Sequence, residues 1–317
     1  MPLFDVYIMV DWSGARQAVQ GANSIWIGIA FRTGGTLALE VLENPATRQQ
    51  AQILIENRLT EFLAADKRVL IGFDFPYGYP RGLAQALGLP GPALPWARVW
   101  HHIATTVVDT ATNASNHFQV AASMNVIMGV PPGPFWGYVK NGTPLPENLT
   151  CKRPASWVNL DGARTCTLLP KLVLPELRHP EALFQVNGWG YPQPTWKLAY
   201  PGSVGSQVLT GIPRVYALRY APAFDQHSEV WPFETDFTAT PGAGRTPYIM
   251  HAEIYPSAVP TDMTLHNVKD AAQVLTLARH FATLDINGQL GAALCAPAGL
   301  SPSQIRDCIE QEGCILK

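Results

Sequence analysis

Runs of apolar residues separated by short polar turns predict strands in the first part of the chain. Residues 4–11, 24–32 and 36–42 are rich in β-branched and aromatic side chains, and their short connections predict an antiparallel three-stranded meander. A helix is expected over 46–65, where apolar positions recur on one face. Because this helix is a crossover, the apolar run 68–75 is expected to lie parallel to the first strand.

The middle of the chain does not keep this regular pattern. Residues 77–201 contain six of the nine tryptophans and many prolines, and they do not resemble a second regular sheet. We interpret this segment as a large irregular insertion or lid, with one helix expected over 98–112. The tryptophans argue against disorder. They either form the insertion's own core or stack on a bound base.

Regular structure returns after residue 202. The pattern predicts that the segment 202–207 leads into a helix that runs to about Tyr220, followed by strands over 229–234 and 248–255. A helix over 268–283 and a short helix that begins at Ser301 complete the chain. The order βββαβ…αβα predicts an α/β fold. Its mixed sheet, flanked by helices, is expected to come from residues 1–76 and 202–317.

Composition limits the class of protein. No segment approaches the roughly 20 apolar residues that span a bilayer, and the N-terminus lacks the basic start of a signal peptide. The five cysteines form no CxxC pair, as expected for free thiols in a reducing compartment. These features predict a cytoplasmic protein that does not bind membranes.

The net charge of −2 conceals an asymmetry along the chain. Residues 151–220 carry eight basic and three acidic side chains, whereas residues 221–317 carry five basic and eleven acidic ones. This suits an anionic substrate held beside a cation, although charge also fluctuates along ordinary chains. We expect Arg153, Arg178 and Lys197 to hold the phosphate or clamp a base. The low overall basicity argues against tight binding of long duplex nucleic acid.

Carboxylates lie at or near the ends of three predicted strands. Asp11 ends the first apolar run, Asp74 ends the fourth, Glu253 lies in a late strand, and Asp270 opens the next helix. The carboxyl ends of parallel strands are where α/β sheets place their chemistry, and adjacent carboxylates repel unless a proton or cation lies between them. We therefore expect these four residues to be catalytic and to bind one or two Mg²⁺ or Mn²⁺ ions.

These acidic residues also have structural interpretations. Asp11 can close a local turn, a buried Asp74 can be satisfied by a hydrogen-bond donor alone, and Asp270 can serve as a helix cap. The glycine-rich start of the 202–220 helix offers backbone N–H groups for an anion. Three nearby polar side chains are expected to add substrate contacts, namely Ser13, Ser206 and Gln207.

Four short segments resemble domain-of-unknown-function family 429, which is described as a family of predicted nucleases with a ribonuclease-H-like fold. These segments are Val10-Asp11-Trp12-Ser13-Gly14, Gly72-Phe73-Asp74-Phe75-Pro76, Glu253-Ile254-Tyr255-Pro256 and Lys269-Asp270-Ala271-Ala272. The resemblance covers roughly residues 4–76 and 200–285. It implies a ribonuclease-H-like core with a metal-dependent phosphodiesterase centre at the four acidic residues. The long tryptophan-rich insertion departs from the family pattern.

Together these features predict a divalent-metal-dependent hydrolase of phosphodiester bonds, acting on a phosphate-containing substrate such as a nucleic acid or nucleotide. Two other classes remain open. One is an ATP-dependent phosphotransferase of the sugar-kinase and actin superfamily, which shares the sheet but normally uses two copies of it. The other is a non-catalytic binding protein that retains the fold.

Overall fold

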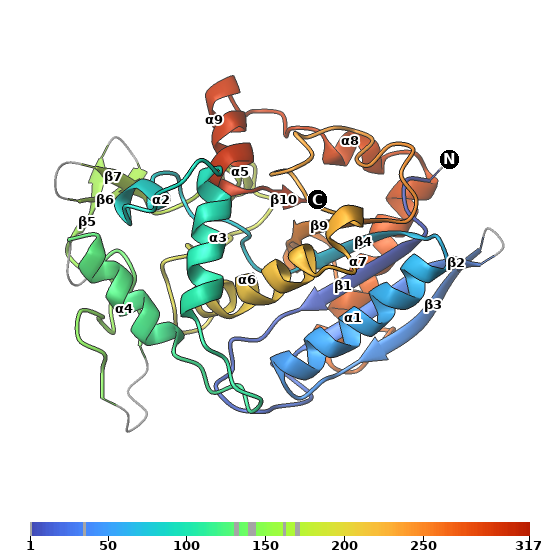
Figure 1. Ribbon diagram of the computed structural model, residues 1–317, viewed down its shortest axis with the longest axis horizontal. Helices are drawn as coiled ribbons and strands as arrows, with labels where there is room; N and C mark the ends of the chain where they lie inside the picture. The colour runs from blue at the N-terminus through green and yellow to red at the C-terminus, as the bar shows by residue number, and fades with distance from the viewer. Residues whose placement is uncertain (1, 34–35, 130–132, 139–143, 161–162, 169–171) are drawn as a thin grey trace.

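In the computed structural model, one mixed β-sheet organises the chain and helices cover both of its faces (Figure 1). The structure describes residues 2–33, 36–129, 133–138, 144–160, 163–168 and 172–317. Within them the strand order is β3-β2-β1-β4-β9-β10, with β8 also beside β9. The strands are β1 (Val6–Asp11), β2 (Trp26–Thr33), β3 (Thr36–Glu43), β4 (Arg68–Phe73), β8 (Ser228–Val230), β9 (Tyr248–Ile254) and β10 (Ile315–Leu316).

The register confirms the predicted meander and crossover. Strands β1, β2 and β3 pair antiparallel in sequence order. Helix α1 (Arg48–Ala64), capped by the Thr47 side chain, then returns the chain so that β4 lies parallel to β1. Strand β9 pairs parallel with β4, with Phe73 opposite Glu253. The carboxyl ends of β1, β4 and β9 therefore meet at one edge of the sheet.

Alternating side chains of the strands build two cores on opposite faces of the sheet. Ile8 of β1 packs on the face covered by α1, where Ile55 is buried. Met9 packs on the other face, against helix α7 (Lys269–Ile286), where Val274 is buried. Figure 1 shows α1 across the front of the sheet and α7 behind it. This two-residue alternation decides which way each strand-end carboxylate points.

The described part of residues 77–201 contributes no strand to the main sheet. Their described part contains helices and a small antiparallel sheet of order β5-β6-β7. The elements are α2 (Leu83–Ala86), α3 (Pro95–Thr106), α4 (His117–Ile127), β5 (Trp157–Leu160), β6 (Ala163–Thr167), β7 (Val173–Pro175) and α5 (His179–Val186). The expectation of no second sheet was therefore wrong. The helix predicted over 98–112 begins earlier, at Pro95, because proline, which lacks an N–H, is tolerated in a first helical turn. It also ends earlier, at Thr106, where the chain becomes extended at Val107.

The tryptophans of the insertion form its core. Five of the six are buried, namely Trp96, Trp100, Trp136, Trp157 and Trp196. Trp96 stacks on Phe233 at 4.6 Å between ring centroids, which ties the insertion to the later part of the chain. These side chains are therefore unavailable for stacking on a substrate base.

The remaining helices complete the layers. Helix α6 (Gly205–Tyr220) lies beside α3, while α8 (Leu290–Leu294) and α9 (Pro302–Asp307) precede the C-terminal strand (Figure 1). Single turns occur at Asp225–His227, Pro256–Ala258 and Cys308–Glu312. A Cβ on Gly211 of α6 would lie only 2.3 Å from Phe75 Cζ, so this helix packs tightly over the residues that follow β4. Among the described residues, no helix combines the length and apolar character needed to cross a membrane.

Candidate functional site

The carboxyl ends of β1 and β4 bring Asp11 and Asp74 together. Val10 pairs with Phe73 in the parallel register, so the next residues along the two strands are Asp11 and Asp74. The N–H of Asp74 donates to Val10 O (3.2 Å), which extends the pairing past the end of β4. Both carboxylates follow the alternation of Met9 and point toward the α7 side of the sheet.

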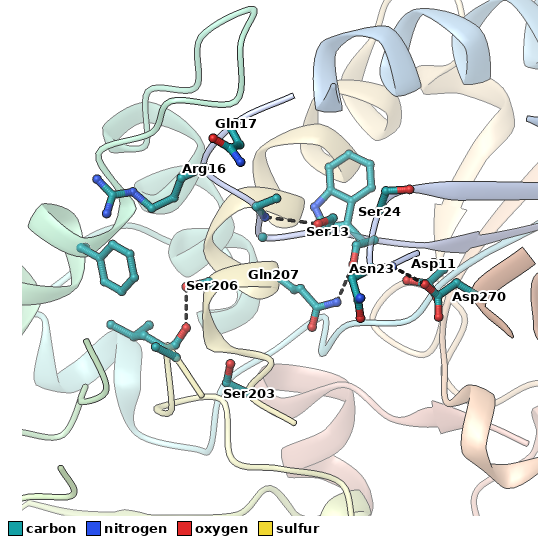
Figure 2. A pocket seen from close by; sticks show the side chains of 16 residues that line it. Asp11, Ser13, Arg16, Gln17, Asn23, Ser24, Ser203, Ser206, Gln207 and Asp270 are labelled. Atoms are coloured by element: carbon teal, nitrogen blue, oxygen red, sulfur yellow. Dashed lines mark hydrogen bonds between the residues drawn. The ribbon is translucent and has the colours of Figure 1, made fainter. Parts of the chain in front are cut away.

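Asp270 joins this pair from helix α7. It is the second residue of the helix, and its charge disfavours ionisation of both Asp11 and Asp74. Figure 2 shows Asp11 and Asp270 together at one end of a cavity. The N–H of Asn23, in the loop before β2, donates to Asp270 Oδ2 (2.7 Å). The structure thus brings together three of the four predicted catalytic carboxylates.

Burial and mutual repulsion disfavour the ionised forms of these carboxylates. Burial, followed by the charges of Asp74 and Asp270, holds the pKa of Asp11 well above its usual range, while Lys269 acts in the opposite direction. Burial also raises the pKa of Asp74 to about 7, although the Trp12 N–H that donates to Asp74 Oδ1 (2.6 Å) opposes this shift. A proton or a cation between the carboxylates relieves the repulsion.

Glu253 does not join the cluster. In the sheet, Glu253 of β9 pairs with Phe73 of β4, which is the residue before Asp74. Because side chains alternate between the two faces, Glu253 points to the α1 side of the sheet. There it is 3% exposed and accepts hydrogen bonds from Arg178 Nη1 (2.8 Å) and Arg178 Nη2 (2.5 Å), as well as from Tyr77 N–H (2.9 Å). A carboxylate engaged in this way is already satisfied without a metal.

Arg178, predicted to bind substrate, is instead a buried connection between three segments. It is 0% exposed, and besides Glu253 it bonds Glu181 Oε1 (2.9 Å) and Glu312 O (2.7 Å). Burial alone lowers the pKa of Arg178, but the charges of Glu253 and Glu181 outweigh this and raise it. Burial raises the pKa of Glu181 to about 7. The Arg178 side chain thus joins α5, β9 and the C-terminal segment.

Asp11 and Asp270 lie in the wall of a polar cavity of about 790 Å³, which we call the large cavity. Its wall includes Asp11, Asp270, Ser13, Arg16, Ser206 and Gln207. Figure 2 shows the acidic pair at one end, Arg16 toward the other end, and Gln207 between them. The cavity therefore has a negative end and a positive end, an arrangement suited to a ligand that carries both a metal-bound and a free anionic group.

Ser206, predicted to contact the substrate, lies in the wall of the large cavity but is held by the protein. Its hydroxyl donates to Leu198 O (2.7 Å), so His117 Nε2 at 3.0 Å must be the donor of the second bond. Burial, followed by the charges of Arg48 and Arg16, lowers the pKa of His117 to about 3. A neutral histidine that donates to Ser206 cannot take its proton, so this pair fixes α4 against α6.

Gln207 links the wall of the cavity to the carboxylates. Its side-chain amide donates to Trp12 O, and Trp12 N–H in turn donates to Asp74. Ser13, also predicted to contact substrate, accepts a bond from Ala15 N–H (3.2 Å) and is 9% exposed. Ser13 and Gln207 both line the large cavity, as predicted substrate-contacting residues should.

A second cavity of about 460 Å³, the small cavity, adjoins the large one at Gln207. Asp74, Lys269, Tyr191 and Tyr255 line it, and Ser203 and Gln207 line both cavities. Asp11 and Asp270 face the large cavity, whereas Asp74 faces the small one. The carboxylates therefore stand at the boundary between the two spaces.

The predicted substrate-binding residues Arg153 and Lys197 are engaged by other parts of the protein. Arg153 pairs with Glu176 (2.7 Å), and Lys197 donates to Gln193 Oε1 (3.2 Å) and Pro201 O (3.0 Å). Neither Arg153 nor Lys197 lines the large or the small cavity. Two further charged residues of the 151–220 segment, Lys171 and Asp161, lie outside the described residues. A phosphate clamp built from this segment is therefore not supported.

Sequence reasoning missed Arg16, Asn23 and Lys269. Arg16 lies in the polar loop that follows β1, and no carboxylate pairs with it within the described part of the chain. Its guanidinium carbon lies 5.8 Å from the centroid of the Phe118 ring. The sequence does contain a signal for Arg16 as a binding residue, because it lies five residues after Asp11 and loops at the carboxyl ends of strands carry binding residues.

The carboxylates suit a hard divalent cation, but the site is not preformed. In the described ranges, no three or more His, Cys, Asp or Glu side chains are grouped so that they could hold a metal ion. Magnesium keeps several waters and is often bound through only one or two carboxylates. Asp11 and Asp74 meet that smaller requirement because they are adjacent. Burial favours their protonated forms in the absence of a cation, so a bound cation has to displace a proton.

No family model, no curated protein and no solved structure matches this chain.

Proposed function

We propose that this protein is a divalent-metal-dependent hydrolase of phosphodiester bonds with a ribonuclease-H-like fold. The observation that carries the proposal is the adjacent pair Asp11 and Asp74 on parallel strand ends, joined by Asp270, beside a polar cavity. The strand order β3-β2-β1-β4-β9, antiparallel among the first three and parallel beyond β1, is the order that the proposed fold requires. Carboxylates with raised pKa values in a cleft are typical of functional sites.

Each acidic residue has a role in this proposal. Asp11 and Asp74 would hold a Mg²⁺ or Mn²⁺ ion, which when bound activates water and stabilises the charge that develops on the phosphate. Asp270 keeps one carboxylate oxygen that accepts no hydrogen bond from the described residues, and this oxygen can orient the attacking water and accept its proton. Hydrolysis forms a P–O bond to the water oxygen and breaks the P–O bond to the leaving oxygen, which takes up a proton. Glu253 stays in its ion pair with Arg178.

The alternatives are weaker on the same structure. A phosphotransferase of the sugar-kinase and actin superfamily normally uses two copies of the sheet. The described residues contain one such sheet and a three-stranded antiparallel one. A non-catalytic binding protein is favoured only by the lack of a preformed three-ligand metal site within the part of the chain that the structure describes. Metal binding by the carboxylate pair would distinguish the hydrolase from this last class.

A hydrolysis assay tests the proposal. The wild-type protein is expected to hydrolyse bis(4-nitrophenyl) phosphate with Mn²⁺ or Mg²⁺ and to lose the activity in EDTA. Asp11→Asn should lower the rate by about 100-fold or more, because it removes a metal ligand. Glu61→Gln is the matched control, since Glu61 is an exposed carboxylate on α1. Equal rates for Asp11→Asn and the wild type would refute the assignment.

A further inference from the structure

The boundary between the two cavities is the feature that limits the substrate. Ser203 and Gln207 line both cavities, Asp11 and Asp270 line the large one, and Asp74 lines the small one. A phosphate held at Asp11 and Asp74 would therefore have an open space on each side. A phosphomonoester needs only one such space, whereas an internal phosphodiester needs two.

The large cavity offers a second anion site away from the carboxylates. Arg16 is exposed, lies toward the end of the cavity opposite Asp11 and Asp270 (Figure 2), and has no carboxylate partner among the described residues. The Phe118 ring beside its guanidinium limits the space that this side chain can explore. A guanidinium in this position is available to bind a second phosphate of the same ligand.

The small cavity offers aromatic surface. Tyr191 is 72% exposed. Tyr255 is fixed between Phe184, at 5.6 Å between ring centroids, and Gly190, where a Cβ would lie 2.6 Å from Tyr255 Cε1. Exposed tyrosine rings are surfaces on which bases stack, and each stacked base contributes about 1–3 kcal/mol.

Resting on the proposed function, we propose that the substrate is a short single-stranded oligonucleotide that crosses the boundary between the cavities. Its scissile phosphodiester lies at Asp11 and Asp74, one neighbouring base stacks on Tyr191 in the small cavity, and the next phosphate in the other direction reaches Arg16. The cavities, of about 790 and 460 Å³, have the size of small-ligand sites.

The charges of the site exclude a long duplex as the preferred ligand. Duplex binding rests on many phosphate contacts. Among the described residues, however, the two cavities together present only Arg16 and Lys269 as cations outside the buried Arg178 network. Few free cations and exposed aromatic surface favour a single strand of a few nucleotides.

Equilibrium binding tests the inference in the full-length Asp11→Asn protein, which removes turnover. The probe is a fluorescently labelled single strand of about six thymidines, followed by anisotropy over a range of salt concentrations. Tyr191→Ala is expected to weaken binding by about 5- to 150-fold, the equivalent of one stacked base. Arg16→Ala should weaken binding and reduce the slope of log K against log salt by about 0.7, the value for one phosphate contact on a single strand.

Exposed residues outside both cavities provide the controls. Tyr220→Ala and Arg58→Ala alter an exposed tyrosine and a partly exposed arginine that line neither cavity, and they should leave binding unchanged. Effects no larger than these controls for Tyr191→Ala and Arg16→Ala would overturn the inference, as would tighter binding of a duplex of equal length. If Asp11-dependent hydrolysis of bis(4-nitrophenyl) phosphate persists in that case, only the inference fails. Oligonucleotide binding without any such hydrolysis would instead refute the proposed function.

Discussion

Replacing Asp74 by asparagine should stabilise the metal-free protein at alkaline pH. The ordinary pKa of 3.8 is raised to about 7 in the folded protein, and at 1.36 kcal/mol per pKa unit this corresponds to about 4 kcal/mol. That value is an upper limit on the cost of ionising Asp74 in the fold. Asparagine keeps an acceptor for the Trp12 N–H (2.6 Å) but loses the stronger charge-assisted bond. We therefore expect a net gain of roughly 1–3 kcal/mol.

The stability difference between Asp74→Asn and the wild type should depend on pH. A raised carboxyl pKa means that the folded state holds its proton more tightly, so the stabilisation from Asp74 is fully present below about pH 4 and is lost as the pH rises through about 7. Urea unfolding in EDTA should show Asp74→Asn more stable than wild type near pH 8 and not near pH 4, with Glu61→Gln as the control at both. A loss of stability at pH 8, or an equal gain at both values, would refute the reasoning.

Three further predictions address the metal, the buried ion pair and helix packing. Calorimetric titration with Mg²⁺ should show affinity rising from pH 6 to pH 8, because the proton on Asp74 must leave before the cation binds; a flat profile would contradict this. Arg178→Ala should lower the free energy of unfolding by about 3–5 kcal/mol, because it leaves the buried Glu253 and Glu181 unpaired; a wild-type urea midpoint would instead leave Arg178 available for substrate. Gly211→Ala should cost about 1–3 kcal/mol, because its Cβ would overlap the Phe75 ring, and a thermal scan showing no loss would refute that packing.

The main sheet was readable from the sequence because its strands and its crossover leave clear local signals. The apolar run before Asp11, the helical stripe of α1 and the run before Asp74 fix β1, α1 and β4 in order. The short β5-β6-β7 sheet was missed because its strands are only three to five residues long, too short for a clear alternation. Its pairing depends on contacts that the local pattern does not encode.

The candidate site was only partly readable for the same reason. The adjacency of Asp11 and Asp74 follows from parallel pairing of their strands, which the crossover helix predicts. The direction of Glu253 depends on the register of β9 against β4, and a shift of one residue reverses the face of the sheet. Its partner Arg178 is 75 positions away in the sequence, so the ion pair leaves no local signal.

A crystal structure with bound Mn²⁺ tests the central claim most directly. The account predicts an anomalous peak at the ends of β1 and β4, with oxygens of Asp11 and Asp74 at roughly 2.0–2.2 Å and waters completing the coordination. Glu253 should remain bonded to Arg178. An empty site at Asp11 and Asp74 at saturating Mn²⁺, or a cation held by Glu253 in place of them, would contradict the account.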